Sequence, residues 1–149
     1  MRAVVQRVCR ARVWADGQVR AQIEAGLLVY LAVGRDDDDE DLAYLVEKVR
    51  HLRIFTDAAG KMNLEVGQVG GQVMVVSAFS VYGDARRGRR PSFDAAAGPQ
   101  HASRLYERFC KRLASTGLTV QQGVFAAHMD VEAVNDGPIC ILLDSRRGF

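Results

Sequence analysis

A run of seven apolar and aromatic residues, 27–33, lies between Gly26 and Gly34 and constrains the fold more than any other segment. A strand with one solvent-exposed face alternates apolar and polar residues, whereas this run contains almost no polar residue on either face. It is also far shorter than the roughly 20 apolar residues that a membrane-spanning helix needs. The run therefore predicts a central strand that is buried on both faces.

Several other segments have the composition of strands. Residues 12–15 and 18–23 flank Asp16 and Gly17, and an Asp-Gly pair between such segments is a strong signal of a tight hairpin. A second strongly β-branched run covers residues 72–81. The remaining extended segments are expected at residues 3–8, 53–55, 118–124, 129–134 and 139–143.

Two segments have the period of an amphipathic helix. Apolar residues recur every three or four positions along residues 40–51 and again along residues 99–116, which Gly117 follows. The acidic residues 36–39 precede the first helix, where carboxylates favour the positive end of the helix dipole, so a solvated cap is preferred over a cation site. The order of strands, helix, strand, helix and strands predicts an α/β fold. Its sheet is either mixed or split into two packed sheets, with the helices on one side.

The composition is that of an ordinary globular protein. The chain has 149 residues, 48% of them hydrophobic and 26% charged, with a formal net charge of +2, which predicts one domain over residues 1–149. It contains no run of about 18 apolar residues, so we expect no membrane span. Its three cysteines, Cys9, Cys110 and Cys140, form no close pair, which favours free thiols in the cytoplasm over a disulfide frame or a zinc site.

Few side chains are placed for catalysis. None of the three histidines has the spacing of a metal site, and the chain has no phosphate-binding loop or dinucleotide motif, so we expect neither a metal nor a cofactor. Ser77, Ser80 and Cys140 are the candidate nucleophiles, but no base lies beside any of them in the sequence. For Cys140 a packed thiol is favoured over a reactive one, because free cysteine is among the most buried residue types.

The loop at residues 84–93, here called the basic loop, gathers the side chains of Arg86, Arg87, Arg89 and Arg90. Guanidinium groups so close together repel one another unless an anion neutralises them, and arginine pairs with phosphate in a fork geometry. The basic loop therefore predicts either a nucleic-acid contact or a solvated surface loop, and the residues alone leave both open.

The segment Asn-Asp-Gly-Pro at residues 135–138 separates two apolar runs. Glycine accepts a positive φ and proline has no N–H, so this segment predicts a turn that interrupts the sheet. A second stretch, Ser-Ala-Phe-Ser at residues 77–80, ends another apolar run. Together the two stretches predict a pocket that has a strand end as its floor and the Gly-Pro backbone as its roof.

Five short motifs, each weak alone, follow one another at residues 52–55 (Leu-Arg-Ile-Phe), 60–64 (Gly-Lys-Met-Asn-Leu), 77–79 (Ser-x-Phe), 88–93 (Gly-Arg-Arg-Pro-Ser-Phe) and 135–138 (Asn-x-Gly-Pro). As a set they are specific, and the chain from Met1 to about Ser145 resembles the D-aminoacyl-tRNA deacylases of the bacterial and eukaryotic type. The resemblance implies a homodimeric, cytosolic hydrolase that cleaves the ester between tRNA and a D-amino acid or glycine. It also implies a three-layer α/β/β fold, with mixed sheets forming a barrel-like core and two main helices on one side.

The resemblance also assigns a site. It implies a catalytic group of Ser77, Ala78, Phe79, Ser80 and Cys140. It further implies that tRNA and substrate contact Arg86, Arg87, Arg89, Arg90, Asn135 and Met129. In the family the Gly137-Pro138 peptide bond is cis and reaches into the partner subunit's pocket, and an arginine on the first strand, matched by Arg7, helps to hold it.

The implied chemistry needs few side chains. Two main-chain carbonyl groups held against the substrate's Cα leave room for hydrogen but not for a side chain, so a D-residue or glycine fits and an L-residue does not. The family's hydrolysis is RNA-assisted, because the 2′-hydroxyl of the terminal ribose helps to activate the attack. Backbone N–H groups near Phe79 would hold the developing oxyanion.

At three positions the chain departs from the usual family pattern: Ala78 replaces Gln, and Ser80 and Cys140 each replace Thr. Ala78 lacks an amide that could order the substrate, and Cys140 could act as a thiolate if its pKa were lowered. Two alternatives therefore stay open. One is a tRNA- or DNA-binding module of the same fold with weak or no turnover, and the other is a hydrolase that uses Cys140 covalently. A relative with relaxed chirality would carry a bulkier residue than Gly137.

Overall fold

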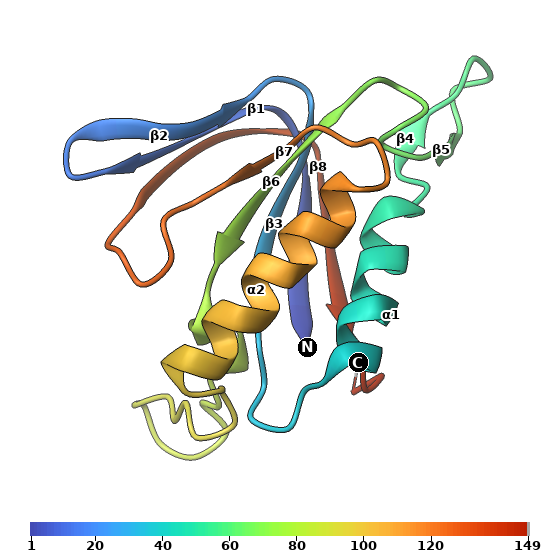
Figure 1. The fold of residues 1–149 in the computed structure, drawn as a ribbon. Coiled ribbons are helices and arrows are strands. Elements are labelled where there is room, and N and C mark those ends of the chain that lie inside the picture. Colours follow the sequence, from blue (N-terminus) through green and yellow to red (C-terminus); the bar gives the residue numbers. More distant parts are fainter. Residues whose placement is uncertain (149) are drawn as a thin grey trace.

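The computed structural model describes residues 1–148 and places two α-helices beside a strongly curved sheet (Figure 1). In chain order the elements are β1 (Arg2–Ala15), β2 (Gln18–Ile23), β3 (Gly26–Ala32), α1 (Asp39–Arg50), β4 (Phe55–Thr56), β5 (Met62–Leu64), β6 (Gln72–Ser77), the 3₁₀ helix η1 (Phe79–Tyr82), α2 (Pro99–Ala114), β7 (Val120–Gln122) and β8 (Asp130–Asp144). No helix among residues 1–148 has the length and apolar character needed to cross a bilayer.

β3 lies in the middle of a six-stranded sheet of order β2-β1-β3-β6-β7, in which β8 pairs with β1. All side chains of β3 except Tyr30 are buried, which confirms the prediction of a central strand. β3 runs parallel to β6, and β6 runs parallel to β7. Because β1 is antiparallel to β2, β3 and β8, the sheet is mixed.

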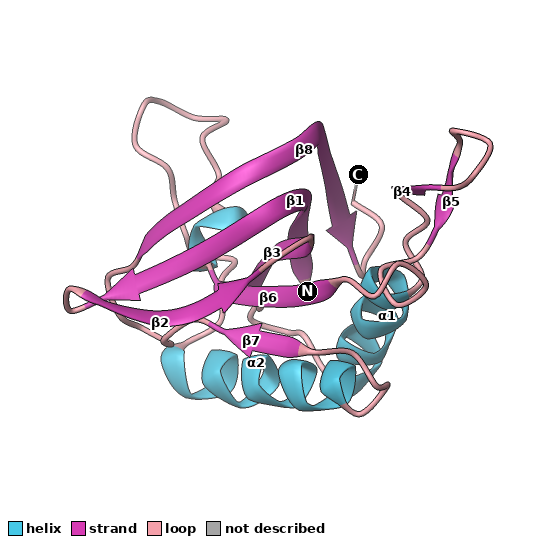
Figure 2. Cartoon of the chain, turned by 90° about the horizontal axis from the view of Figure 1, so that it is seen from above, coloured by secondary structure: helices cyan, strands magenta, loops and turns pink. Residues whose placement is uncertain are grey.

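The length of β1 explains how the sheet curls. On one edge its residues 2–8 pair with β3 and its residues 11–15 pair with β2, while its other edge pairs with β8. Figure 2 shows that β8, β1 and β2 fold over β6 and β7, so that the sheet is nearly closed and the helices lie outside it. The expected α/β fold with a barrel-like core and two helices on one side is confirmed.

Two apolar clusters fill the fold, one on each face of β3. Leu27 and Val29 belong to the larger cluster, which lies between the sheet and the helices and includes the fully buried Phe109 of α2. Leu28 belongs to the smaller cluster, inside the curled sheet. Successive side chains of a strand point to opposite faces, so a strand with a core on each side carries no polar stripe. This arrangement explains why residues 27–33 are apolar throughout.

The acidic residues before α1 form a helix cap. Oδ1 of Asp38 accepts hydrogen bonds from the backbone N–H groups of Glu40 and Asp41 at 2.9 and 3.2 Å. Oδ2 of Asp41 in turn accepts from the backbone N–H of Asp38 at 3.0 Å. This reciprocal capping box confirms the interpretation of the acidic run as a cap.

The strand predicted for residues 72–81 ends earlier, at Ser77, and η1 follows it. The backbone N–H of Ala78 still donates to the carbonyl of Leu31 at 2.9 Å. β3 ends one residue later, at Ala32, so the next residues of the chain have lost their neighbouring strand. The β-branched composition of this segment therefore continues past the point where pairing stops.

The prediction that a turn interrupts the sheet at residues 135–138 is wrong, because β8 continues through them and keeps its pairing with β1 on both sides. β8 pairs with β1 on both sides, with Asn135 opposite Val8 and Cys140 opposite Gln6. Residues 136–139 therefore face the single residue Arg7 and form a large bulge, here called the 136–139 bulge. Proline and glycine are tolerated here because the bulge lies on an edge strand. In the same way, the predicted strands 3–8 and 12–15 are one strand, β1.

Candidate functional site

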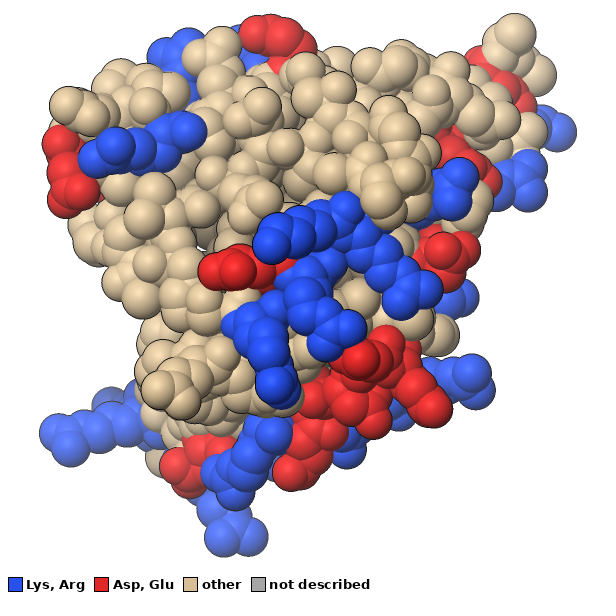
Figure 3. All heavy atoms as spheres, viewed as in Figure 1, with Lys and Arg blue, Asp and Glu red and all other residues tan. Residues whose placement is uncertain are grey.

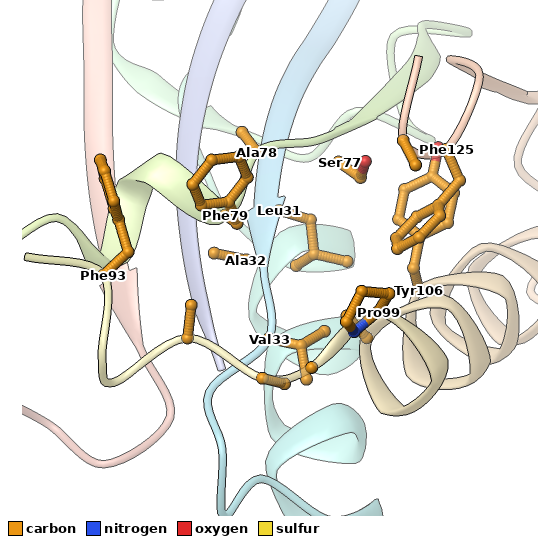
Figure 4. A pocket seen from close by; sticks show the side chains of 15 residues that line it. Leu31, Ala32, Val33, Ser77, Ala78, Phe79, Phe93, Pro99, Tyr106 and Phe125 are labelled. Atoms are coloured by element: carbon orange, nitrogen blue, oxygen red, sulfur yellow. The ribbon is translucent and has the colours of Figure 1, made fainter.

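A cavity of about 480 Å³ opens where β3 and β6 end side by side (Figure 4). Ligands commonly bind beyond the carboxyl ends of neighbouring parallel strands. The walls come from these strands, η1, the segment before α2, α2 itself and the segment after β7. The lining residues are Leu31, Ala32, Val33, Ser77, Ala78, Phe79, Phe93, Ala96, Ala97, Gly98, Pro99, Ala102, Tyr106, Phe125 and Ala126.

The cavity wall is almost entirely apolar. No lining residue carries a charge, and only Ser77 and Tyr106 carry hydroxyl groups. The Tyr106 hydroxyl donates to the carbonyl oxygen of Val75 at 2.8 Å, and burial raises the pKa of Tyr106, so this phenol stays neutral. Ser77 has no acid or base beside it in the wall. The wall therefore holds no pair of nucleophile and base. Among residues 1–148, no group of three or more His, Cys, Asp or Glu side chains could hold a metal ion.

The start of η1 supplies polar groups from the main chain. The first hydrogen bond of this turn runs from the N–H of Val81 to the carbonyl of Ala78, at 3.1 Å. The N–H groups of Phe79 and Ser80 come before it and donate to no acceptor within residues 1–148. Phe79 lines the cavity, so the start of η1 adjoins its wall. Unpaired N–H groups of this kind can stabilise a negatively charged oxygen.

Two phenylalanine rings connect the cavity to the basic loop. Phe79 is 61% exposed and meets the ring of Phe93 edge to face, with 5.0 Å between the centroids. Phe93 is the last residue of the basic loop, and the loop is closed at its base because Asp84 and Ser92 exchange backbone hydrogen bonds of 2.8 and 2.9 Å. The arginines of the basic loop are therefore carried on a closed loop that ends at the mouth of the cavity.

The four arginines of the basic loop differ in their surroundings. Arg86 binds Asp84 through two nitrogens, at 2.9 and 2.6 Å, and this contact holds the pKa of the Asp84 carboxyl well below its usual range. Arg87, Arg89 and Arg90 are exposed and make no ion pair within residues 1–148. Three guanidinium groups thus remain available to an anionic partner.

Another basic group covers the exposed face of α2. It consists of Arg104, Arg108, Lys111 and Arg112. Figure 3 shows basic side chains over α2 in the middle of this face, directly beside acidic ones. Arg108 lies 2.5 Å from Asp39 at the start of α1, so part of this positive charge is already balanced within the protein.

The 136–139 bulge is held by Arg7. The side chain of Arg7 is only 10% exposed, and its Nε donates to the main-chain oxygen of Asp136 at 3.2 Å. Its Nη1 donates to the carbonyl of Ile54 at 2.5 Å. Gly137 has a φ of +131°, the peptide bond between Gly137 and Pro138 is cis, and both residues are exposed.

The cavity and the 136–139 bulge lie apart within one chain. Ser77 shares a row of the sheet with Leu31 of β3 and Ala3 of β1, and Arg7 lies four residues further along β1. The separation is roughly 13 Å along the strands and roughly 14 Å across them. No residue of the bulge lines the cavity. The expected pocket roofed by the Gly-Pro backbone is therefore wrong for a single chain.

The other expected site residues are divided between these places. Ser77, Ala78 and Phe79 line the cavity, and Ser80 lies just outside its wall. Met129 packs against the smaller apolar cluster and does not line the cavity. Asn135 is exposed beside the 136–139 bulge.

Cys140 is exposed, so the expectation of a packed thiol is wrong. Its Sγ lies 4.0 Å from Nε2 of Gln6, on the paired strand β1. Ile139 and Ile141 point toward the larger core, and Cys140 points the opposite way. At this position of the sheet the outer face of β8 is not covered by a further layer of the same chain.

Residues 4–144 match the family described as D-Tyr-tRNA(Tyr) deacylase. The chain belongs to that family. Over 149 residues that span 100% of both sequences, it is 58% identical to a D-aminoacyl-tRNA deacylase of Anaeromyxobacter dehalogenans. A protein of the same name from Koribacter versatilis is 55% identical over the same span. The resemblance read from the five motifs is thereby confirmed.

Solved structures share this fold of the D-Tyr-tRNA(Tyr) deacylase family. A c-Myc DNA Unwinding Element Binding Protein is 34% identical, with a TM-score of 0.91 over 97% of this chain and 98% of the other. A structure described as a "probable eukaryotic D-amino acid tRNA deacylase" has a TM-score of 0.83 at 18% identity, over 96% of this chain and 98% of the other. The second likeness is one of fold.

Three aromatic residues line the cavity without having been predicted as site residues. Tyr106 lies on the apolar face of α2, where the helical period predicts only a core residue. Phe125 lies in a loop without periodic signal, and its ring centroid is 5.8 Å from that of Tyr106. Phe93 could have been found, because it ends a family motif at residues 88–93.

Proposed function

We propose that the protein hydrolyses the ester bond of D-aminoacyl-tRNA and releases the D-amino acid and the tRNA. The observation that carries this proposal is the cavity lined by Phe79 at the start of η1, where two backbone N–H groups are unpaired and the wall holds no acid–base pair. Such a wall suits a reaction in which the protein positions the substrate and stabilises charge. The full-length similarity to proteins named D-aminoacyl-tRNA deacylase supports the same activity.

In the proposed reaction a water molecule attacks the carbonyl carbon of the ester. The neighbouring 2′-hydroxyl of the terminal ribose helps to take up a proton from that water, which makes the catalysis RNA-assisted. The oxyanion that forms accepts hydrogen bonds from the N–H groups of Phe79 and Ser80. The bond to the 3′-oxygen of the ribose then breaks, this oxygen receives a proton, and both products leave.

The proposed chiral screen comes from Gly137 and Pro138 of a second copy of the chain. Both residues are exposed at the edge of the sheet and are distant from their own cavity, which supports a homodimer in which each bulge enters the partner's cavity. Main-chain groups held there leave space for the Cα hydrogen of a D-residue but not for the Cβ of an L-residue. Glycine has no Cβ, so glycyl-tRNA is also a substrate.

The basic loop is the proposed contact for the tRNA backbone. Arg87, Arg89 and Arg90 are exposed, and the loop ends at the cavity mouth, where the 3′ end of the tRNA has to enter. Arginine pairs with phosphate without reading sequence, so this contact adds affinity for any tRNA.

Single-turnover deacylation of D-Tyr-tRNA, L-Tyr-tRNA and Gly-tRNA tests the proposal. We expect the D-tyrosyl and glycyl esters to be cleaved at least about a hundredfold faster than the L-tyrosyl ester. A tRNA that ends in 2′-deoxyadenosine should react slowly, because the assisting hydroxyl is missing. Equal rates for both enantiomers would contradict the chiral screen. A lack of turnover with all three substrates would contradict the enzyme.

A nucleic-acid-binding module with weak or no turnover is the second candidate. The similarity to the structure named c-Myc DNA Unwinding Element Binding Protein favours it, as does Ala78 in the cavity wall. This candidate predicts that tRNA binds but D-tyrosine is not released.

Covalent catalysis by Cys140 is the third candidate, and the Cys140→Ala variant tests it. Cys140 does not line the cavity of its own chain, so we expect this variant to keep most of its activity. A loss of several orders of magnitude would favour the covalent route.

A further inference from the structure

The hairpin of β4 and β5 takes no part in the proposed reaction, yet it is firmly closed. Nε of Arg53 donates to the main-chain oxygen of Asn63 at 2.9 Å, and another nitrogen of the same guanidinium donates to the side-chain oxygen of Asn63. At the tip, the carboxylate of Asp57 accepts two backbone hydrogen bonds of 2.9 and 3.0 Å. A two-stranded hairpin is marginally stable alone. These contacts therefore hold a shape that the strand pairing itself would not maintain.

The inner end of this hairpin binds Arg7. The carbonyl of Ile54 accepts a buried hydrogen bond of 2.5 Å from Nη1 of Arg7. The guanidinium carbon of Arg7 also lies 6.0 Å from the centroid of the Phe55 ring. Nε of the same guanidinium binds Asp136. One planar group thus connects the hairpin on one side with the 136–139 bulge on the other.

The hairpin is the more buried of these two anchors. The side chain of Asp136 is 48% exposed, whereas Ile54 and Phe55 are only 6% and 8% exposed. Because a guanidinium is planar, fixing Nη1 against Ile54 also fixes the direction of the Nε–H bond. An arginine held by Asp136 alone would sample several rotamers and would carry the bulge with it.

We propose that the β4–β5 hairpin is a positioning element for Gly137 and Pro138, and that through Arg7 it determines how strictly L-aminoacyl esters are excluded. This inference rests on the proposed function. The contacts run from Asn63 through Arg53, next to Ile54 in the chain, to Arg7 and Asp136. The hairpin residues line no part of the cavity, so they act on selectivity and leave the chemical step unchanged.

The Asn63→Ala and Arg53→Gln variants open the hairpin without touching Arg7. The exclusion of L-residues depends on placing the main-chain groups of the bulge to within a fraction of an ångström. A misplacement of such groups by about 1 Å can change a rate about a hundredfold. We expect the D-to-L ratio of kcat/KM to fall by about tenfold or more, through faster cleavage of L-Tyr-tRNA. The D-Tyr-tRNA rate should stay within about threefold of the parent.

Hydrogen exchange gives a readout that needs no substrate. The amides of Asn135 and Cys140, where pairing with β1 resumes on either side of the bulge, should exchange faster in both hairpin variants, because the bulge opens more often. Lys61→Gln is the matched control, since the exposed side chain of Lys61 lies on the same hairpin outside these contacts. It should leave both the ratio and the exchange rates unchanged. Thermal melts identify any variant that fails to fold, in which case the milder Arg53→Lys takes its place.

Two outcomes separate this inference from the function on which it rests. If the parent protein does not prefer D-Tyr-tRNA, the proposed function fails. If the parent prefers the D-ester and Arg7→Met loses that preference, but folded hairpin variants keep both the ratio and the parent's exchange rates at Asn135 and Cys140, only the role of the hairpin is refuted. A parallel drop of both rates in the hairpin variants would also refute it.

Discussion

Arg7 and Asp136 are joined through a single nitrogen. Nε of Arg7 lies 3.2 Å from the main-chain oxygen and 3.0 Å from Oδ2 of Asp136. The pair spans β1 and β8 at the point where their register shifts, so it replaces ladder bonds that the 136–139 bulge interrupts. The residue directly before Gly137 is thereby held from within the protein.

Replacing Arg7 with Met should destabilise the protein by about 2 kcal/mol, because two hydrogen bonds from a charged group are lost and the buried carbonyl of Ile54 is left unpaired. Urea unfolding measures this change. Arg10→Met is the matched control, since Arg10 is an exposed arginine on the same strand, and it should change the stability by less than about 0.5 kcal/mol. Equal unfolding midpoints for the two variants would contradict the anchoring role of Arg7.

Gly137→Ala should cost about 1 to 3 kcal/mol, because an L-residue rarely adopts a positive φ of this kind. The φ of Gly137 is +131°, and an added Cβ would lie 2.9 Å from the backbone nitrogen of Ile139. Gly67→Ala is the control, because an added Cβ there meets Leu118 at an ordinary 3.4 Å and φ lies outside the positive range. Both variants are compared by chemical unfolding. A Gly137→Ala protein as stable as the control would show that the bulge relaxes freely.

Cys110 should resist modification in the native protein. Burial raises the pKa of its thiol from 9.0 to about 12, so at about pH 8 the thiolate fraction is about a thousandfold lower than for an unperturbed thiol. Labelling with a disulfide reagent, followed by mass spectrometry, should find Cys110 unmodified until denaturant is added. Modification of native Cys110 as fast as of the exposed Cys9 would contradict this.

The same pKa shift makes stability depend on pH. The unfolded chain releases the Cys110 proton near pH 9.0 and the folded chain only near about pH 12. The contribution of the Cys110 thiol to the free energy of unfolding is therefore fully present below pH 9.0, and it is lost as the pH rises toward about 12. Cys110→Ala should remove this part of the alkaline decline in urea unfolding experiments.

Reversing Arg87 and Arg89 to Glu should weaken tRNA binding. Each phosphate contact contributes about 0.9 to the slope of log affinity against log salt, so losing both should reduce that slope by about two. Arg86 is a poorer choice, because it is already bound to Asp84. Filter binding over a range of salt concentrations measures the slope. The charge-matched control is the double variant Arg20→Glu and Lys48→Glu. It should reduce tRNA affinity and the salt slope by less than the reversal of Arg87 and Arg89. If both double variants bind equally, the basic loop is only a solvated surface.

Local patterns predicted the parts of the fold that depend on nearby residues. The burial of β3, the periods of α1 and α2, and the hairpin at Asp16 and Gly17 are all encoded within short windows. The continuity of β8 was not predictable in this way. Its partner β1 is more than a hundred residues away in the chain, and Asn-Asp-Gly-Pro is a turn sequence in most settings. Only the paired strand shows that the chain stays in the same sheet.

The sequence predicted only part of the candidate site, because the rest also depends on contacts between distant segments. Ser77, Ala78 and Phe79 were identified through the family motifs, and they do line the cavity. Phe125 and Tyr106 come from a loop and a helix that only the tertiary fold brings together. The exposure of Cys140 depends on which faces of β8 other elements cover, and this packing cannot be predicted from a single segment.

The 136–139 bulge also has a consequence for the evolution of the protein. Since β8 pairs with β1 on both sides of residues 136–139, we expect mutations between Asn135 and Cys140 to leave the register of the other strands intact. The peptide at residues 136–139 can therefore vary in shape at a cost in stability, while the register of the surrounding strands is kept.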